Sequence, residues 1–256
     1  LMGDHCQLPA VVTQKPESLI VRGEAFEQIS MSSLGMSAFE RLIRCAEQRG
    51  DQSSTAMLTM QGRMHKDVMA FVSETFYGGL LKPIADWQRM DEPLPWSKIL
   101  PHRAVFVPLE SPLDQANTEA HVLAQLAVTL HDLSHRSQQD FSIGIITPFR
   151  VQNNAISGLL PEHLRAVITV DTVERFQGSE RDVILYGTCV GSPIELESIV
   201  SETEVRGVLI DRKLNVAMTR ARQQFVLLGS PSVLNRSKAY TKALFLLPSL
   251  YLQQTT

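Results

Sequence analysis

The stretch IGIITPFRVQNNAISGLL, residues 143–160, joins a short apolar run to a segment with helical spacing. The run at 143–146 shows little alternation of polar and apolar residues, which is typical of a strand buried on both faces. Residues 149–159 follow it and predict a helix. A buried strand followed directly by a helix is the repeating unit of parallel sheets, so this stretch predicts an α/β fold.

The same pattern recurs on both sides of this stretch. Further apolar runs lie at 104–107, 166–170, 183–190 and 225–228, and further helical stretches lie at 118–132 and 211–222. Strands that alternate with helices predict a parallel sheet covered by helices on both faces. Ligands of such sheets bind beyond the carboxyl ends of the strands, so we expect the functional residues to follow the strands directly.

Regular elements are also expected before and between these strands. Ser37 and Glu40 form a capping box at the start of a predicted helix over 37–49, which Gly50 ends. A second helix is predicted over 64–76. The proline-rich segment 82–103 has neither period, so it predicts an extended connector. The acidic segment 195–204 predicts a solvated loop.

Composition excludes several classes of protein. The 256 residues include 44% hydrophobic residues, a net charge of -3 and three cysteines. This content can form a core and excludes wholesale disorder or a disulfide framework, so we expect an intracellular, cytoplasmic protein, with the nucleus left open. The longest apolar run, 243–252, is about half of the ~20 residues that a membrane span needs. The net charge offers no general attraction for nucleic acid, although a local basic strip could bind it.

Four polar segments could carry chemistry. Residues 3–9 place the carboxylate of Asp4 and the amide of Gln7 on a turn beside what would be the end of a strand. Residues 172–180 follow the predicted strand at 166–170, although a capped polar connection is the simpler explanation. Residues 215–222 include Arg220 and Arg222 on the predicted helix 211–222. Guanidinium groups fork onto phosphate oxygens, but two arginines near a helix end are also favoured by the helix dipole alone. Arg63 precedes the predicted helix 64–76, where backbone N–H groups attract anions or simply form a capping turn.

Taken together and in order, these segments resemble the motifs of superfamily 1 nucleic-acid helicases of the Upf-like branch. Five segments match motifs of the family. Residues 3–9 resemble Gly-Asp-x-x-Gln-Leu-Pro, residues 61–65 resemble Gln-Tyr-Arg-Met-His, and residues 146–152 resemble Ile-Thr-Pro-Tyr-x-x-Gln. Residues 172–180 resemble Thr-Val-Asp-x-Phe-Gln-Gly-x-Glu, and residues 215–222 resemble Asn-Val-Ala-Leu-Thr-Arg-Ala-Lys. Residues 38–42 and 76–80 resemble the phrases after the first two of these. The resemblance covers nearly the whole chain.

The resemblance implies a motor of two RecA-like domains with ATP between them and a single strand across both. Residues 1–57 would be the end of the first domain, and 58–256 would be the second. A phosphate-binding loop contains a Gly-Lys pair, and no such pair occurs in this chain. We therefore expect a RecA-like parallel sheet without its own phosphate-binding loop. We expect the chain to be the C-terminal part of a longer helicase and to be inactive alone.

The resemblance also implies roles for individual residues. Gln7 would sense the γ-phosphate, and Arg63 and Arg220 would act as arginine fingers on it. The residues implied in nucleotide binding are Gln61, Gly178 and Glu180, with Glu180 accepting from the ribose. The residues implied in contacts with the nucleic-acid backbone are Thr147, Pro148, Phe149 and Thr172. The implied ligands are ATP with Mg²⁺, shared with the first RecA-like domain of the same polypeptide, and single-stranded DNA or RNA; no resident metal site and no membrane are implied.

Two positions depart from the family's pattern. Gly62 stands where the family has a tyrosine that resembles a stacking platform for adenine, so the base must be bound in another way or less selectively. Glu174 replaces an aspartate and keeps its charge. Gly62 favours an alternative, in which the chain is a degenerate helicase-like module that binds nucleic acid or protein without ATP turnover.

Overall fold

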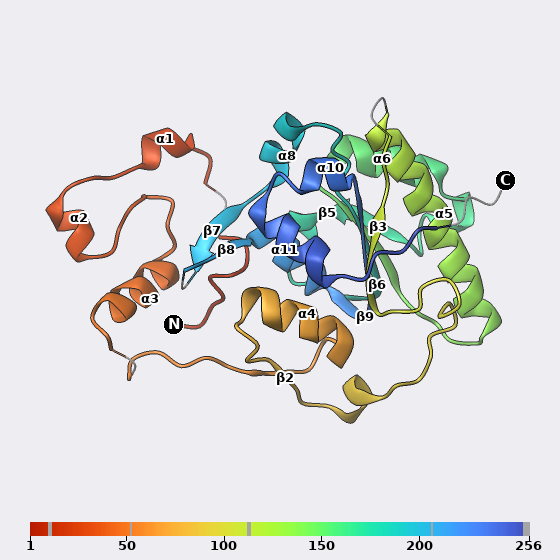
Figure 1. The fold of residues 1–256 in the computed structure, drawn as a ribbon, viewed down its shortest axis with the longest axis horizontal. Coiled ribbons are helices and arrows are strands. Elements are labelled where there is room, and N and C mark those ends of the chain that lie inside the picture. Colours follow the sequence, from red (N-terminus) through yellow and green to blue (C-terminus); the bar gives the residue numbers. More distant parts are fainter. Residues whose placement is uncertain (10–11, 52, 112–113, 206, 253–256) are drawn as a thin grey trace. The chain divides into compact units, whose positions relative to one another are not determined.

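The computed structural model describes residues 1–9, 12–51, 53–111, 114–205 and 207–252. They form two compact units, Leu1–Thr59 and Met60–Thr256 (Figure 1). The described residues of the first unit form the helices α1 Pro16–Leu19, α2 Glu24–Gln28 and α3 Ala38–Gln48. Each unit is described below by itself.

The second unit holds the strands of the central sheet and most of the helices. Its strands are β1 Met60–Gln61, β2 Lys82–Pro83, β3 Ala104–Pro108, β4 Ile143–Thr147, β5 Thr169–Thr172, β6 Arg181–Gly187, β7 Glu202–Val205, β8 Val208–Asp211 and β9 Ala221–Gly229. Its helices are α4 Lys66–Phe76, η1 Asp86–Arg89, α5 Gln115–Arg136, α6 Arg150–Leu159, η2 Glu162–Leu164, α7 Val173–Phe176, α8 Pro193–Ile199, α9 Arg212–Met218, α10 Pro231–Leu234 and α11 Lys238–Leu246, where η1 and η2 are 3₁₀ helices.

Five strands form the central sheet in the order β3-β9-β6-β4-β5, and all neighbouring pairs are parallel. Parallel neighbours need a crossover, and α5, α6, α7 and α9 lie on the connections between these strands (Figure 1). The predicted α/β fold with a parallel sheet covered by helices is confirmed.

Helices cover both faces of the sheet. On one face, α5 and α6 lie side by side. One cluster of buried apolar side chains includes Leu123 of α5, Val183 of β6 and Val226 of β9. On the other face lie α4, α7 and α9. A Cβ at Gly144 in β4 would lie 2.9 Å from the Phe176 ring, so only glycine lets α7 pack this closely. Packing on both faces therefore fixes the positions of the strands, and with them the positions of the polar segments predicted to carry chemistry, which lie next to the strand ends.

Local signals predicted both ends of α3 and the end of α4. The Ser37 side chain accepts a hydrogen bond from the Glu40 N–H at 3.0 Å at the start of α3, and Gly50 follows the helix with a φ of 64°. The α4 helix begins at Lys66 rather than at residue 64, because His65 lies outside the helix and its Nδ1 accepts from the Asp67 N–H at 3.2 Å. Capping side chains and glycines are local signals, which explains these successes.

Other expectations were wrong. The helix predicted over 211–222 ends at Met218, and Arg222 lies in β9 instead. Residues 195–204 are not a plain loop, because α8 and β7 occupy most of them. The predicted connector 82–103 contains β2 and η1. The strand predicted at 166–170 begins at Thr169, after η2. Among the residues described above, we find no helix long and apolar enough to cross a membrane.

Candidate functional site

Three segments meet at the amino ends of β6 and β9. Arg181 and Ala221 are register partners in these strands, and the Arg181 N–H donates to the Arg220 carbonyl at 3.0 Å. The preceding residues, Glu180 and Arg220, are therefore brought together. The turn before α4 joins them, because the His65 N–H donates to the Arg222 carbonyl at 2.7 Å. We call Arg63, Glu180, Arg220 and Arg222 the arginine cluster.

Of the two predicted arginine fingers, Arg63 and Arg220, Arg63 has the more accessible guanidinium group. Its Nε donates to Glu180 Oε2 at 2.7 Å, and its Nη1 donates to the Thr219 carbonyl at 3.1 Å. The Arg63 and Glu180 side chains are 34% and 45% exposed, so solvent screens this ion pair and it adds at most about 1 kcal/mol to stability. Such a weakly held guanidinium can exchange its carboxylate partner for another anion.

Arg220 lies beneath the surface of the arginine cluster, with only 2% of the residue exposed. Its Nε donates to the Val216 carbonyl at 3.0 Å, its Nη1 to the Ser179 carbonyl at 3.4 Å, and its Nη2 to Thr219 Oγ1 at 2.9 Å. Arg220 therefore joins the turn after α9 to the segment before β6.

The resemblance gave Arg222 no individual role, yet this residue completes the cluster. Its Nε lies 3.7 Å from Glu180 Oε1, and its Nη1 donates to Asp182 Oδ1 at 3.2 Å. The guanidinium carbon also lies 5.2 Å from the centre of the Trp87 ring. Both oxygens of Glu180 thus face arginines. Trp87 gave no signal in the sequence, because it falls in the connector that was expected to be irregular.

The turn that presents Arg63 is held by two glutamine side chains. Gln61 Oε1 accepts from the Arg63 and Met64 N–H groups at 2.9 and 2.8 Å. Gln88, which is fully buried, donates through Nε2 to the Gln61 and Met64 carbonyls at 3.1 and 2.7 Å. The amide of Gln61 is therefore engaged within the turn and orients Arg63. Sequence reasoning missed Gln88, whose partners are 24 and 27 residues away.

Gly178 lies in the segment that leads from α7 back to β6. Its φ is +89°, and a Cβ built on it would meet nothing within 4 Å. Glycine is thus required here by the backbone conformation rather than by crowding. The residue is exposed, so its backbone is accessible beside the arginine cluster.

A second group of predicted residues lies at the opposite, carboxyl edge of the sheet. Thr147 and Thr172 are register partners at the ends of β4 and β5, so the structure brings them side by side. Both are buried, and the Thr147 hydroxyl donates to Asn153 Oδ1 at 2.6 Å. Pro148 and Phe149 are half-buried and lead into α6, whose N-cap has no side-chain hydrogen bond.

The predicted site residues do not all follow strands directly. Thr147 and Thr172 do end strands, but Gly178, Glu180 and Arg220 lie before strands, at the amino edge. The short segment after β5 explains this, because α7 and the turn at Gly178 carry the chain back across the sheet within eight residues, 173–180. The candidate site thus has two separate parts on the second unit.

Gln7, the remaining predicted residue, belongs to the first unit. Its Nε2 donates to Asp4 Oδ2 at 2.8 Å, and Asp4 Oδ1 accepts from the Cys6 N–H at 3.0 Å. Asp4, His5 and Cys6 each offer one potential metal-ligand atom, and these three atoms lie within 4.8 Å of one another. The Asp4 carboxylate already fixes this turn, which gives it a structural task without a metal.

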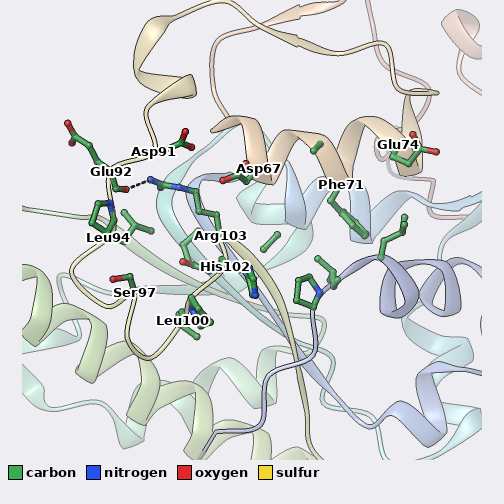
Figure 2. A pocket seen from close by; sticks show the side chains of 18 residues that line it. Asp67, Phe71, Glu74, Asp91, Glu92, Leu94, Ser97, Leu100, His102 and Arg103 are labelled. Carbon is green, nitrogen blue, oxygen red and sulfur yellow. Dashed lines mark hydrogen bonds between the residues drawn. The ribbon is translucent and has the colours of Figure 1, made fainter.

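A cavity of about 570 Å³ lies apart from both groups, between α4, the segment before β3 and the end of α11 (Figure 2). Its lining includes buried apolar side chains, four carboxylates and one guanidinium: Phe71, Leu94 and Leu100; Asp67, Glu74, Asp91 and Glu92; and Arg103. Arg103 Nη2 donates to the Glu92 carbonyl at 2.7 Å, the bond drawn in Figure 2. The excess of carboxylates repels phosphate groups, so this cavity is not a candidate for nucleotide binding.

Comparisons with known proteins agree with the resemblance to helicases found in the sequence. A family model described as an AAA domain matches residues 34–232. The chain is 31% identical over 255 residues to the Regulator of nonsense transcripts 1 homolog of Arabidopsis thaliana, covering 92% of this chain and 18% of that protein. It is 32% identical over 253 residues to the ATP-dependent helicase upf1 of Schizosaccharomyces pombe, covering 91% of this chain and 24% of that protein.

A solved structure, the C-terminal domain of a possible DNA helicase from a Lactobacillus, matches with a TM-score of 0.38 and 14% identity, over 70% of this chain and 96% of that one. The chain spans 18% to 24% of the two relatives described above. The family model covers most of the chain, and the relatives cover more than nine-tenths of it. The chain therefore belongs to this AAA domain family and is a Upf1-like region of the superfamily 1 helicases.

Proposed function

We propose that this chain is the second motor domain of an ATP-dependent helicase or translocase that acts on single-stranded DNA or RNA. The observation that carries this proposal is the meeting of Arg63, Glu180 and Arg220 from three separate segments. Phosphoryl transfer spreads negative charge over the γ-phosphate oxygens, and inserted arginines stabilise that charge. ATP and Mg²⁺ would be held jointly with the first RecA-like domain of the same polypeptide, which would contribute Gln7.

ATP binding would act through an exchange of partners at Arg63. The Arg63 guanidinium pairs with Glu180, and an incoming γ-phosphate offers it more negative charge than a carboxylate does. Glu180 is then released to accept from a ribose hydroxyl, while Gln61 keeps the turn in place and the exposed backbone at Gly178 can approach the nucleotide. Closure of the two domains follows because the arginines have phosphate to bind only in the closed state.

The carboxyl edge would hold the strand. Thr147, Pro148, Phe149 and Thr172 gather there, and Arg150 begins α6 with an exposed side chain. The N–H groups in the first turn of a helix and a nearby cation both favour a phosphate. Contacts with phosphates position a strand without reading its sequence, as a translocating enzyme requires. We expect the protein to act inside the cell, in the cytoplasm or the nucleus.

Strand binding is tested by Thr172→Val in the full-length protein. The substitution keeps the shape of the side chain and removes its hydroxyl, so we expect single-strand affinity to fall by roughly 2- to 10-fold, which is the worth of one hydrogen bond. The loss should be similar for different sequences. Fluorescence anisotropy of a labelled single strand at fixed salt measures it, and Thr129→Val, a change at a half-buried threonine within α5, is the control. Equal affinities of the wild-type protein and the Thr172→Val variant would remove Thr172 from the site.

Gly62 separates an active motor from the alternative, a binding module without turnover. A Cβ at Gly62 would lie 3.4 Å from the Ile84 side chain, an ordinary contact, so position 62 can carry a side chain in place of glycine. If ATP binds here, the new ring should tighten its binding by about 2- to 12-fold through stacking. Affinity for ribose 5′-triphosphate, which lacks the base, should not change. Calorimetric titration of the full-length protein compares the two ligands.

The control for this substitution is Gly158→Tyr, because Gly158 in α6 also has open space around it. An equal gain for both ligands would show that the tyrosine does not stack on the base. Absence of strand-stimulated ATP hydrolysis in the full-length wild-type protein would favour the alternative function.

A further inference from the structure

Glu119 on α5 is a buried carboxylate to which the proposed function gives no task. It is 0% exposed and lies among apolar neighbours that include Ala120 and Leu123. Burial of a carboxylate costs free energy unless hydrogen bonds compensate, and an apolar side chain of similar size would often stabilise the fold more. Its presence in the core therefore suggests a role in placing other groups.

Both oxygens of Glu119 accept hydrogen bonds. Oε2 accepts from the Cys189 N–H at 2.8 Å, and Oε1 accepts from Gln115 Nε2 at 2.7 Å. Cys189 lies two residues after β6 and has a φ of 56°, which a residue with a side chain rarely adopts. The bond to Glu119 thus holds the chain in an uncommon conformation where it leaves the sheet.

Gln115 extends this connection to the chain after β3. Its Nε2 also donates to the Leu109 carbonyl at 2.9 Å, and its Oε1 accepts from the Ser111 N–H at 2.8 Å. Leu109 directly follows β3. Through Gln115, Glu119 therefore ties together the segments that follow β3 and β6, both at the carboxyl edge.

A third connection runs to the end of β4. Gln152 of α6 is buried, and its Nε2 donates to the Ala116 carbonyl of α5. The next residue, Asn153, accepts from the Thr147 hydroxyl at 2.6 Å. Ala116 follows Gln115 in α5, so these polar contacts of α5 and α6, which we call the Glu119 network, connect the surroundings of Glu119 to Thr147.

We propose that Glu119 is a positioning residue for strand binding: it fixes the segments after β3, β4 and β6, so that Thr147 and the start of α6 are held in place for a phosphate backbone. This inference rests on the strand function proposed above. Glu119 lies beneath the carboxyl edge and has no contact with the arginine cluster, which lies at the amino edge. Its removal should therefore affect the strand and spare the nucleotide.

The titration of Glu119 supports this picture. Burial raises the pKa of its carboxyl to about 7, although hydrogen bonds from Gln115 and Cys189 act in the opposite direction. Burial also raises the pKa of the facing Cys189 thiol and Tyr240 phenol, so both stay uncharged at neutral pH. Because the folded-state pKa of Glu119 lies above its ordinary value of 4.5, its contribution to stability is present at lower pH and is lost as the pH rises toward 7.

The test is Glu119→Gln in the full-length protein. The amide nitrogen must face either the Cys189 N–H or the Gln115 amide, so one of the two bonds is lost. We expect affinity for a labelled single-stranded oligouridine or oligothymidine to fall at least about fivefold, the worth of one hydrogen bond, while the Kd for ATP does not change. The urea midpoint should stay equal or rise at pH 8, where the wild-type protein carries the buried charge, and it should depend less on pH between about 5 and 8.

Two further variants sharpen the test. Cys189→Ala keeps the backbone N–H that Glu119 binds, so it should retain strand affinity. Gln115→Met should repeat the loss, and it serves if Glu119→Gln does not fold. Wild-type strand affinity in Glu119→Gln, together with weakened binding in Thr172→Val, would overturn this inference and leave the proposed function standing. Parallel losses of strand affinity, ATP affinity and stability would show a merely structural role, and absence of strand binding by the wild-type protein would overturn both proposals.

Discussion

Replacing Arg220 by alanine in the full-length protein is expected to lower strand-stimulated ATP hydrolysis by a factor of about 10³ to 10⁵. The reason is electrostatic. A guanidinium that meets the γ-phosphate acts where the transition state gathers charge, and a methyl group supplies nothing there. The affinity for ATP should fall much less than the rate, because the contact matters most in the transition state. Steady-state turnover with saturating single strand measures this effect.

The control must separate catalysis from folding, since Arg220 also donates to Val216, Ser179 and Thr219. Arg220→Lys keeps the charge without the fork, and we expect it to be nearly as slow as the alanine variant. Urea unfolding shows whether each variant is folded, and Arg236→Ala, which removes an exposed arginine, should behave as the wild-type protein does. Undiminished turnover in a folded Arg220→Ala protein would refute the assignment of Arg220 as an arginine finger.

Arg63→Ala is expected to slow the same reaction by about 10² to 10³, the cost of removing one preorganised donor from a developing charge. Stability should change little, because the side chains of the Arg63–Glu180 ion pair are 34% and 45% exposed and the pair is worth at most about 1 kcal/mol. This combination of a large rate loss and a small stability change distinguishes Arg63 from Arg220, which is buried.

Arg165→Ala is a control for Arg63, because each guanidinium donates to a main-chain carbonyl: Arg63 through Nη1 to Thr219, and the exposed Arg165 through Nε to Leu160 at 3.0 Å. It lies after α6, outside the arginine cluster. Turnover should be unaffected by this change. If Arg63→Ala and Arg165→Ala proteins turned over at the same rate, the proposed exchange of Arg63 between Glu180 and phosphate would be wrong.

Local signals in the sequence predicted the elements that depend on local interactions. The start of α3 at Ser37 and the run of β4 are examples. The end of α9 could not be predicted, because no glycine or proline follows Met218. That helix ends because β9 begins at Ala221 to pair with Arg181 of β6, forty residues earlier in the chain. Such a distant pairing overrides the local helical pattern.

For the candidate site, too, local sequence signals predicted some features, whereas others depend on contacts between residues far apart in the chain. The polar segments were found from their residue types and their order, and their roles remain predictions. Their meeting at Arg63 and Glu180, 117 residues apart, depends on strand register, which no local pattern contains. Glu119 could have been noticed, because Leu123, Leu126 and Leu130 recur after it at helical spacing and place it on the apolar face of α5. A lone carboxylate on an apolar helix face was the missed signal.

The contact between Trp87 and Arg222 gives the protein a built-in optical probe. The chain has only two tryptophans, and Trp96 is fully buried, where its indole nitrogen donates to Gln224. A ligand that draws Arg222 away from the Trp87 ring changes the emission of one indole and leaves that of the other unchanged. Events beside Arg63 can therefore be followed by intrinsic fluorescence, without any attached dye.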